Sequence, residues 1–154
     1  MPMYNPGGGS GGGGSFTPSM VRLNGHTGYG STNTQIQRFT TVVANTGSAI
    51  TYADSATLGG TFTINATGVY SIMVNNNFTG ISNFGLSLNS SQLTTAISGI
   101  TATDALAWST VAAAAPLVVS WCGILNAGDV IRSHASASAV SVATAVKFTI
   151  TRVA

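Results

Sequence analysis

Hydrophobic and polar residues alternate along much of this chain with the period of two that is typical of half-buried β-strands. The clearest case is the segment 60–74, where Phe62 and Ile64 alternate with threonines and residues 70–74 alternate after a polar turn that contains Gly68. Two such runs on either side of a short turn predict a β-hairpin.

The same alternation recurs along the rest of the chain and predicts further strands. We expect them at residues 34–44, 84–88, 93–100, 117–125, from 131 onward and at 146–153. Turn signals such as Asn24-Gly25 predict irregular structure over 21–30. Alanines after Thr103 favour a helix, but an all-β context usually overrides such a short signal, so we expect a loop with at most one helical turn over 101–115. Many short strands separated by turns predict an all-β sandwich of about 8–10 antiparallel strands.

Charge is unusually sparse in this sequence. Of its 154 residues, 44% are hydrophobic and 5% are charged, against about 25% charged residues in typical soluble proteins. There is no glutamate, and the net charge is +2. Because a surface with few charges is weakly protected against association, we expect a subunit that works within an assembly.

The charged residues do not cluster. The cations are Arg22, Arg38, Arg132, Lys147 and Arg152, and the carboxylates are Asp54, Asp104 and Asp129. Spread cations make no basic stripe, so we expect no nucleic-acid partner. No apolar run approaches the length needed to cross a bilayer, so we expect no membrane partner.

Candidate chemistry is equally sparse, with three carboxylates, two histidines and one thiol. We interpret Asp129 as a turn residue that accepts backbone N–H groups, His26 as a surface-loop histidine, and His134 as solvent-facing or hydrogen-bonded. Cys122 lies in an apolar run and is expected to be a buried, inert thiol. These residues predict a non-enzymatic protein without metal or cofactor.

The N-terminus, residues 1–20, predicts a Gly-rich arm ahead of a single domain at 21–154. Its glycines have much backbone entropy to lose, so the segment cannot order itself. Either it is a flexible linker, native or engineered, or its larger residues anchor it on another protein. The candidate anchors are Met3, Tyr4, Pro6 and Phe16. The start of the chain has no basic region and no apolar core, so we expect no secretory signal.

Three pieces occur in an order that resembles the trimeric jelly rolls of tumour-necrosis-factor-like proteins and complement globular heads. They are the 60–74 hairpin, the 86–89 strand and turn, and the 125–131 segment, which in that family is a hairpin between two late strands. The final strand also carries a phenylalanine, Phe148, as family members do. The resemblance spans roughly residues 34–154.

This resemblance implies a homotrimer in which one sheet lines a threefold axis. The candidate axis residues are Tyr70, Ile72, Phe148 and Ile150, and the alternative is that they are ordinary core residues of one subunit. Disulfides, calcium ligands and a collagen-like stalk, which many extracellular members have, are absent from the sequence.

A jelly roll with almost no charge and a Gly-rich arm also resembles bacteriophage structural proteins. This second resemblance implies a trimeric decoration (cement) protein that binds the major capsid protein. The protein would then lie on the outer shell of a virion that is assembled in the host cytoplasm. The alternative is the receptor-binding tip of a tail fibre, which would bind a host glycan through exposed loop aromatics such as Trp108 or Tyr29. A third possibility is a secreted or spore-surface trimer of the same fold.

Overall fold

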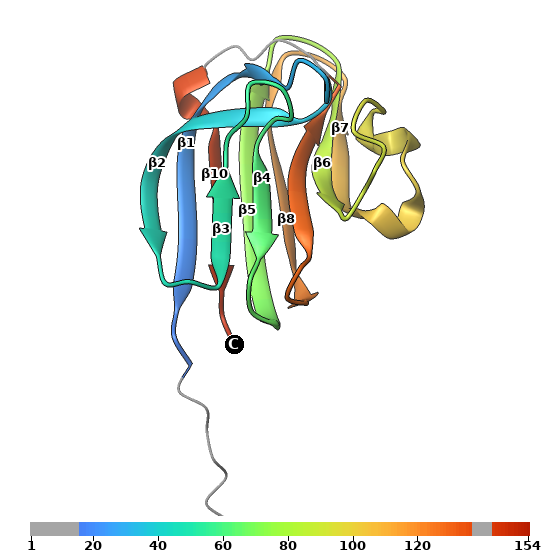
Figure 1. The fold of residues 1–154 in the computed structure, drawn as a ribbon. Helices are drawn as coiled ribbons and strands as arrows, with labels where there is room; N and C mark the ends of the chain where they lie inside the picture. Colours follow the sequence, from blue (N-terminus) through green and yellow to red (C-terminus); the bar gives the residue numbers. More distant parts are fainter. Residues whose placement is uncertain (1–15, 137–142) are drawn as a thin grey trace, which may run out of the picture.

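The computed structural model of this chain describes residues 16–136 and 143–154, and they form a sandwich of two antiparallel β-sheets (Figure 1). Within these residues there is no α-helix, only three 3₁₀ turns: η1 (Ile97–Gly99), η2 (Ala102–Asp104) and η3 (Ala143–Ala145). None of these turns has the length and apolar character that a membrane crossing requires.

Each sheet has five strands. The first sheet runs in the order β2 (Gln37–Thr46), β1 (Ser19–Tyr29), β10 (Lys147–Arg152), β5 (Gly68–Phe78) and β8 (Ala115–Leu125). The second runs in the order β3 (Ile50–Ala53), β4 (Thr61–Ile64), β9 (Val130–Ala135), β6 (Ser82–Leu88) and β7 (Ala105–Val111). Two packed sheets with strands that change sheet are characteristic of a jelly roll. The predicted fold class is therefore confirmed.

The core lies between the sheets and is centred on aromatic side chains. The rings of Phe148 in β10 and Phe62 in β4 stack across the two sheets with centroids 4.0 Å apart, and Phe39 packs edge-on against Phe148 at 5.5 Å. Tyr52 lies against Phe62 and donates its hydroxyl to the Phe39 carbonyl oxygen at 2.6 Å. The alternating apolar residues thus face inward, as the period of two requires.

The predicted hairpin at 60–74 is wrong, although both of its strands exist. β4 and β5 lie in different sheets: β4 pairs with β3 and β9, and β5 pairs with β10 and β8. The polar residues between them form a corner that carries the chain from one sheet to the other. The segment at 125–131 makes a second corner of this kind, because β8 and β9 also belong to different sheets.

Residues 21–30 form most of a long strand rather than the expected irregular segment. β1 is hydrogen-bonded to β2 on one side and to β10 on the other. Gly25 and Gly28 have φ values of +79° and +102°, and the register with β2 shifts after Arg22 and again between His26 and Tyr29. The glycines therefore allow irregularities within a strand, where the sequence suggested turns.

The strand that pairs with β6 begins later than predicted. Residues 93–100 are not a strand and include η1, whereas 105–111, expected to be a loop, form β7. The connection 89–104 lies beside β6 and β7 and is the yellow segment of Figure 1. The strands expected at 34–44, 84–88, 117–125, from 131 and at 146–153 all occur, with ends shifted by a few residues.

Candidate assembly interface

The four residues predicted to line a threefold axis lie inside the subunit. Tyr70, Ile72, Phe148 and Ile150 each have 1% or less of their surface exposed in the single chain. They project from β5 and β10 toward the second sheet, so they cannot contact another copy across an axis. The prediction of these residues as axis residues is wrong, and the alternative reading as subunit core is correct.

The opposite face of the same strands is outward, and the strand register gives its composition. Three cross-strand rows run from β1 through β10 and β5 to β8, and a fourth joins β5 and β8. In order they are Met20–Thr151–Ser71–Cys122, Arg22–Thr149–Met73–Ser120, Asn24–Lys147–Asn75–Val118 and, on β5 and β8 alone, Val69–Ile124. We call these residues the outer face of the first sheet.

The outer face carries several exposed apolar side chains among its polar residues. Met73, Val118 and Ile124 are 52%, 57% and 70% exposed, and they sit on the adjacent strands β5 and β8. Single exposed hydrophobic residues are normal, but several together on one sheet face are typical of an interaction site. This face is therefore the candidate assembly interface.

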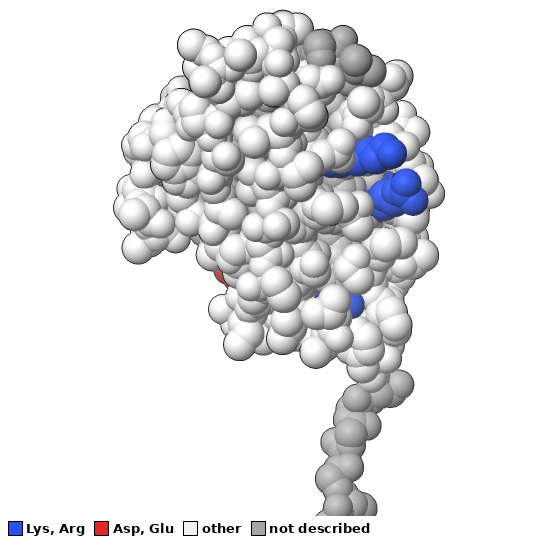
Figure 2. Space-filling model, turned by 180° about the vertical axis from the view of Figure 1, so that it is seen from behind, with Lys and Arg blue, Asp and Glu red and all other residues white. Residues whose placement is uncertain are grey.

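Charge on the outer face is of one sign. Arg22 and Lys147 are its only charged residues among the rows above, and the one ion pair within the described residues, Arg38–Asp54, lies elsewhere. Figure 2 views the molecule from this side and shows a largely uncharged surface with two neighbouring groups of Lys or Arg atoms, a smaller one below them and a small acidic spot at one edge. Copies that met through this face would find no carboxylate there.

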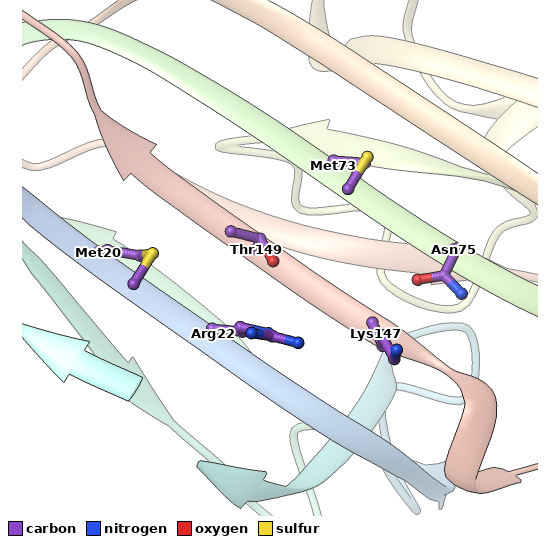
Figure 3. Close-up of a pocket in the computed structure, with 6 residues that line it drawn as sticks. All are labelled: Met20, Arg22, Met73, Asn75, Lys147 and Thr149. Carbon is purple, nitrogen blue, oxygen red and sulfur yellow. The ribbon is translucent and has the colours of Figure 1, made fainter. Parts of the chain in front are cut away.

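A hollow of about 410 Å³ opens on the outer face. Its lining comes from three adjacent strands, β1, β10 and β5 (Figure 3). The lining residues are Met20, Arg22, Met73, Asn75, Lys147 and Thr149. The hollow thus combines two cations, a hydroxyl and an amide with two thioether walls.

Cys122 is exposed, which corrects the prediction of a buried thiol. Along β8 the residues Val119 and Leu125 are buried and Trp121 is partly buried, so the side chains between them point outward. Cys122 occupies one of these outward positions, opposite Ser71 of β5. Its thiol is a natural reporter of whether the outer face is covered.

His26 lies in β1, not in a loop. Its ring packs edge-on against Tyr29, and its Nδ1 is 3.3 Å from the Gln37 amide nitrogen. Burial lowers the pKa of His26 from 6.5 to about 4, because the charged imidazolium is poorly solvated there. The histidine is therefore neutral in the folded protein at neutral pH.

His134 is fully buried on β9, so the solvent-facing alternative is wrong. Neither ring nitrogen has a partner at ordinary hydrogen-bond geometry within the described residues. Burial lowers its pKa to about 4, a backbone group of Thr95 partly offsets this shift, and the Arg132 charge adds to it.

Asp129 behaves as predicted. Its Oδ2 accepts the Asn126 N–H at 2.7 Å, and its Oδ1 accepts a hydrogen bond from the Asn89 side chain at 2.8 Å. The Asn89 amide oxygen in turn accepts the Val130 N–H at 2.8 Å. These bonds tie the corner between β8 and β9 to the end of β6. No group of three or more His, Cys, Asp or Glu residues within 16–136 and 143–154 is arranged to hold a metal ion.

Most of the predicted arm lies outside the described residues, including Met3, Tyr4 and Pro6. Phe16 is 43% exposed, and the Arg152 guanidinium carbon lies 5.5 Å from its ring centroid. β1 begins at Ser19, whose Oγ accepts the Ala49 N–H at 3.1 Å.

The two aromatic residues proposed for glycan binding differ in position. Trp108 is 49% exposed on β7, a strand instead of a loop. Tyr29 ends β1 and is partly buried against His26. β1 and β7, which carry these two residues, belong to different sheets.

No protein-family model matches this chain, and no curated protein matches it. Among solved structures, three crystal structures of murine APRIL, a tumour-necrosis-factor-family protein, are similar to it, each match covering 89% of this chain and 100% of the APRIL chain. The TM-scores are 0.60 at pH 8.0, 0.59 at pH 8.5 and 0.55 at pH 5.0, with 12%, 12% and 13% identity. At such identity the similarity shows the fold, a tumour-necrosis-factor-like jelly roll.

Proposed function

We propose that this protein is a non-enzymatic virion structural protein: a homotrimer that decorates the outer shell of a bacteriophage head by binding its major capsid protein. The observation that carries the proposal is the outer face of the first sheet. Exposed apolar side chains such as Met73, Val118 and Ile124 on one sheet face favour coverage by another protein. The tumour-necrosis-factor-like fold favours two further copies of this chain as the proteins that cover the outer face.

The sparse charge of the whole chain supports permanent assembly. Five cationic and three anionic residues serve 154 positions, so little charge opposes close packing of copies. A cement protein acts by contact area: trimers that bridge neighbouring capsomers add surface that must separate before the shell can expand or rupture. The segment before β1 would supply the grip, because a Gly-rich chain can order itself on a fixed partner.

One observation favours the alternative, a receptor-binding tip of a tail fibre. Trp108 on β7 is 49% exposed, and exposed tryptophans are common in recognition sites. Under this alternative the trimer is retained, but the protein sits at the tail and binds a host glycan through β7.

We predict that Val118→Lys separates the trimer into monomers. Val118 is exposed in the single chain, so the variant folds, but in a trimer it adds a third cation to a face that has no carboxylate. Truncating or mispairing a buried interfacial charge costs about 2–5 kcal/mol, so the dissociation constant should rise by at least about thirtyfold. Light scattering coupled to size exclusion measures the change.

The matched control is Leu58→Lys, which adds the same charge at a residue of similar exposure between β3 and β4. It should leave the trimer intact. The Cys122 thiol gives an independent readout, since it should react slowly with a thiol reagent in the trimer and quickly in the Val118→Lys monomer. A wild-type chain that is monomeric at all concentrations, with a freely reactive thiol, would refute the assembly proposal.

We predict that deleting residues 1–15 abolishes binding to phage shells and leaves the trimer intact. The deletion stops before Phe16 and Ser19, whose contacts with Arg152 and Ala49 belong to the folded domain. Binding is measured by co-sedimentation with shells that lack the protein. Full occupancy by the truncated chain would contradict the anchoring role of the arm.

Gold labelling of whole particles distinguishes the two locations. Label over the head supports the decoration protein, and label at a fibre end supports the tip. In the second case Trp108→Ala should abolish adsorption to host cells while leaving the trimer unchanged. Particles without label would refute both roles.

A further inference from the structure

We infer that the hollow on the outer face of the first sheet is an oxyanion site, formed by Arg22, Lys147 and Thr149, that takes a small tetrahedral anion of the phosphate or sulfate class. The inference goes beyond the proposed function, since the hollow exists in the single chain. That its anion would be enclosed between copies rests on the proposed function.

The strand register places the three donors together. Arg22 of β1 lies directly opposite Thr149 of β10, and Lys147 is two residues earlier on the same face of β10. Diagonal neighbours of this kind on adjacent strands are about 7–8 Å apart, within reach of long side chains. Figure 3 shows the side chains of all three on one side of the sheet.

Both cations are available to a ligand. Neither Arg22 nor Lys147 takes part in an ion pair within 16–136 and 143–154, where Arg38–Asp54 is the only one. Both are exposed, so they can turn toward a bound anion. Guanidinium and ammonium groups are the usual protein partners of phosphate and sulfate, and the Thr149 hydroxyl can donate a further hydrogen bond.

The rest of the hollow has room for the anion and offers it further contacts. Met20 and Met73 form apolar walls, which lower the local dielectric constant and strengthen charge interactions. Asn75 already donates one amide N–H to the Ala145 carbonyl oxygen at 2.9 Å, so it has one N–H left for a ligand. A volume of about 410 Å³ is ample for one tetrahedral anion.

Assembly gives such an anion a role. If three copies meet through this face, six cations approach one another without a carboxylate from the face itself. Burying unpaired charges is costly, and an anion that binds both cations of each copy offsets that cost. By mass action, the anion then stabilises the assembled form.

The test uses inorganic phosphate, with sodium chloride at matched ionic strength as the reference. For the full chain, phosphate at ten times its dissociation constant should raise the Tm by about 3–6 °C. The double variant Arg22→Gln/Lys147→Gln should bind phosphate at least tenfold more weakly, while Arg22→Lys/Lys147→Arg should retain the response. Arg38→Gln, which removes one cation on β2, is the matched control and should respond like the wild type.

The outcomes separate this inference from the proposed assembly. Equal phosphate responses in the wild type and the double Gln variant would refute the site, because the effect would then be a general salt effect. A wild-type chain that binds phosphate but stays monomeric supports the site and refutes the trimer. A trimer that forms without any phosphate response supports the assembly and refutes the site.

Discussion

Replacing Phe148 with alanine is expected to lower the free energy of unfolding by about 3–5 kcal/mol, the usual cost of emptying a large aromatic site in a core. Phe148 has no exposed surface, stacks on Phe62 of the opposite sheet and packs edge-on against Phe39. Within its own sheet it lies between Leu23 and Val74. Its removal therefore opens a cavity where both sheets meet. Chemical denaturation followed by tryptophan fluorescence measures the loss.

Phe16→Ala is the matched control, because it makes the same chemical change at a side chain that is 43% exposed. Its contact with Arg152 is worth about 0.5–1 kcal/mol, so the expected loss is small. The Phe148→Ala loss should also be independent of protein concentration. A loss that vanished at high concentration would place Phe148 at a contact between copies, as the sequence suggested, and not inside the subunit.

The strands could be predicted because burial of one face imposes a period of two. Phe84, Leu86, Val119 and Leu125 are buried in a common core, and Leu88, Leu117 and Trp121 are partly buried against it. β10 was predicted nearly to its ends for the same reason. A two-sheet architecture follows from many such strands, since each needs a second apolar layer.

The pairing of strands could not be predicted in the same way. A polar turn with Gly68 is compatible with two arrangements: the next strand can return beside β4, or it can cross to the other sheet. Both need a sharp polar connection, so the sequence of the turn does not distinguish them. In β1 the glycines at 25 and 28 suggested turns, yet hydrogen bonds from β2 and β10 on both sides hold the strand through these irregularities. Partners distant in sequence overrode the local signal.

The most hydrophobic positions of the sequence do not belong to the candidate interface. Residues such as Tyr70 and Ile72 are buried within the subunit. The exposed side chains of the same sheet are therefore those that alternate with the buried ones, such as Met73, Val118 and Cys122. The signal was present in β8, where Val118 and Ile124 occupy positions that alternation assigns to solvent. An apolar residue at a strand position that the alternation assigns to solvent is the sequence signal for an exposed apolar side chain, and several of these mark a candidate interface.

Acidification from pH 7 to pH 4 is expected to destabilise the fold markedly through its two histidines. His134 is fully buried on β9. Burial holds its pKa at about 4 in the folded protein, against 6.5 when solvated, so the unfolded chain binds a proton that the folded chain does not. Stability is therefore complete above pH 6.5, falls as the pH drops through the window from 6.5 to 4, and changes little below it. A shift of this size corresponds to about 3 kcal/mol for one histidine.

His26 contributes in the same direction, because its pKa is also lowered to about 4 by burial. Arg132 is the charge that acts on the pKa of His134, and it disfavours protonation. The chain has two histidines and no glutamate, so few other groups titrate in this window. Urea denaturation at pH 7, 5.5 and 4 measures the free energy of unfolding across it.

The variants His134→Gln and His26→Gln separate the contributions of the two histidines to the pH dependence of the free energy of unfolding. The comparison holds whatever each substitution does to stability at pH 7. Each should remove its own part of the difference between pH 7 and pH 4, and the double variant should be nearly insensitive to pH over this range. An unchanged difference in the double variant would show that the histidines are not the acid-sensitive groups. Because burial lowers the pKa of each histidine from 6.5 to about 4, His134→Gln and His26→Gln should remove parts of similar size.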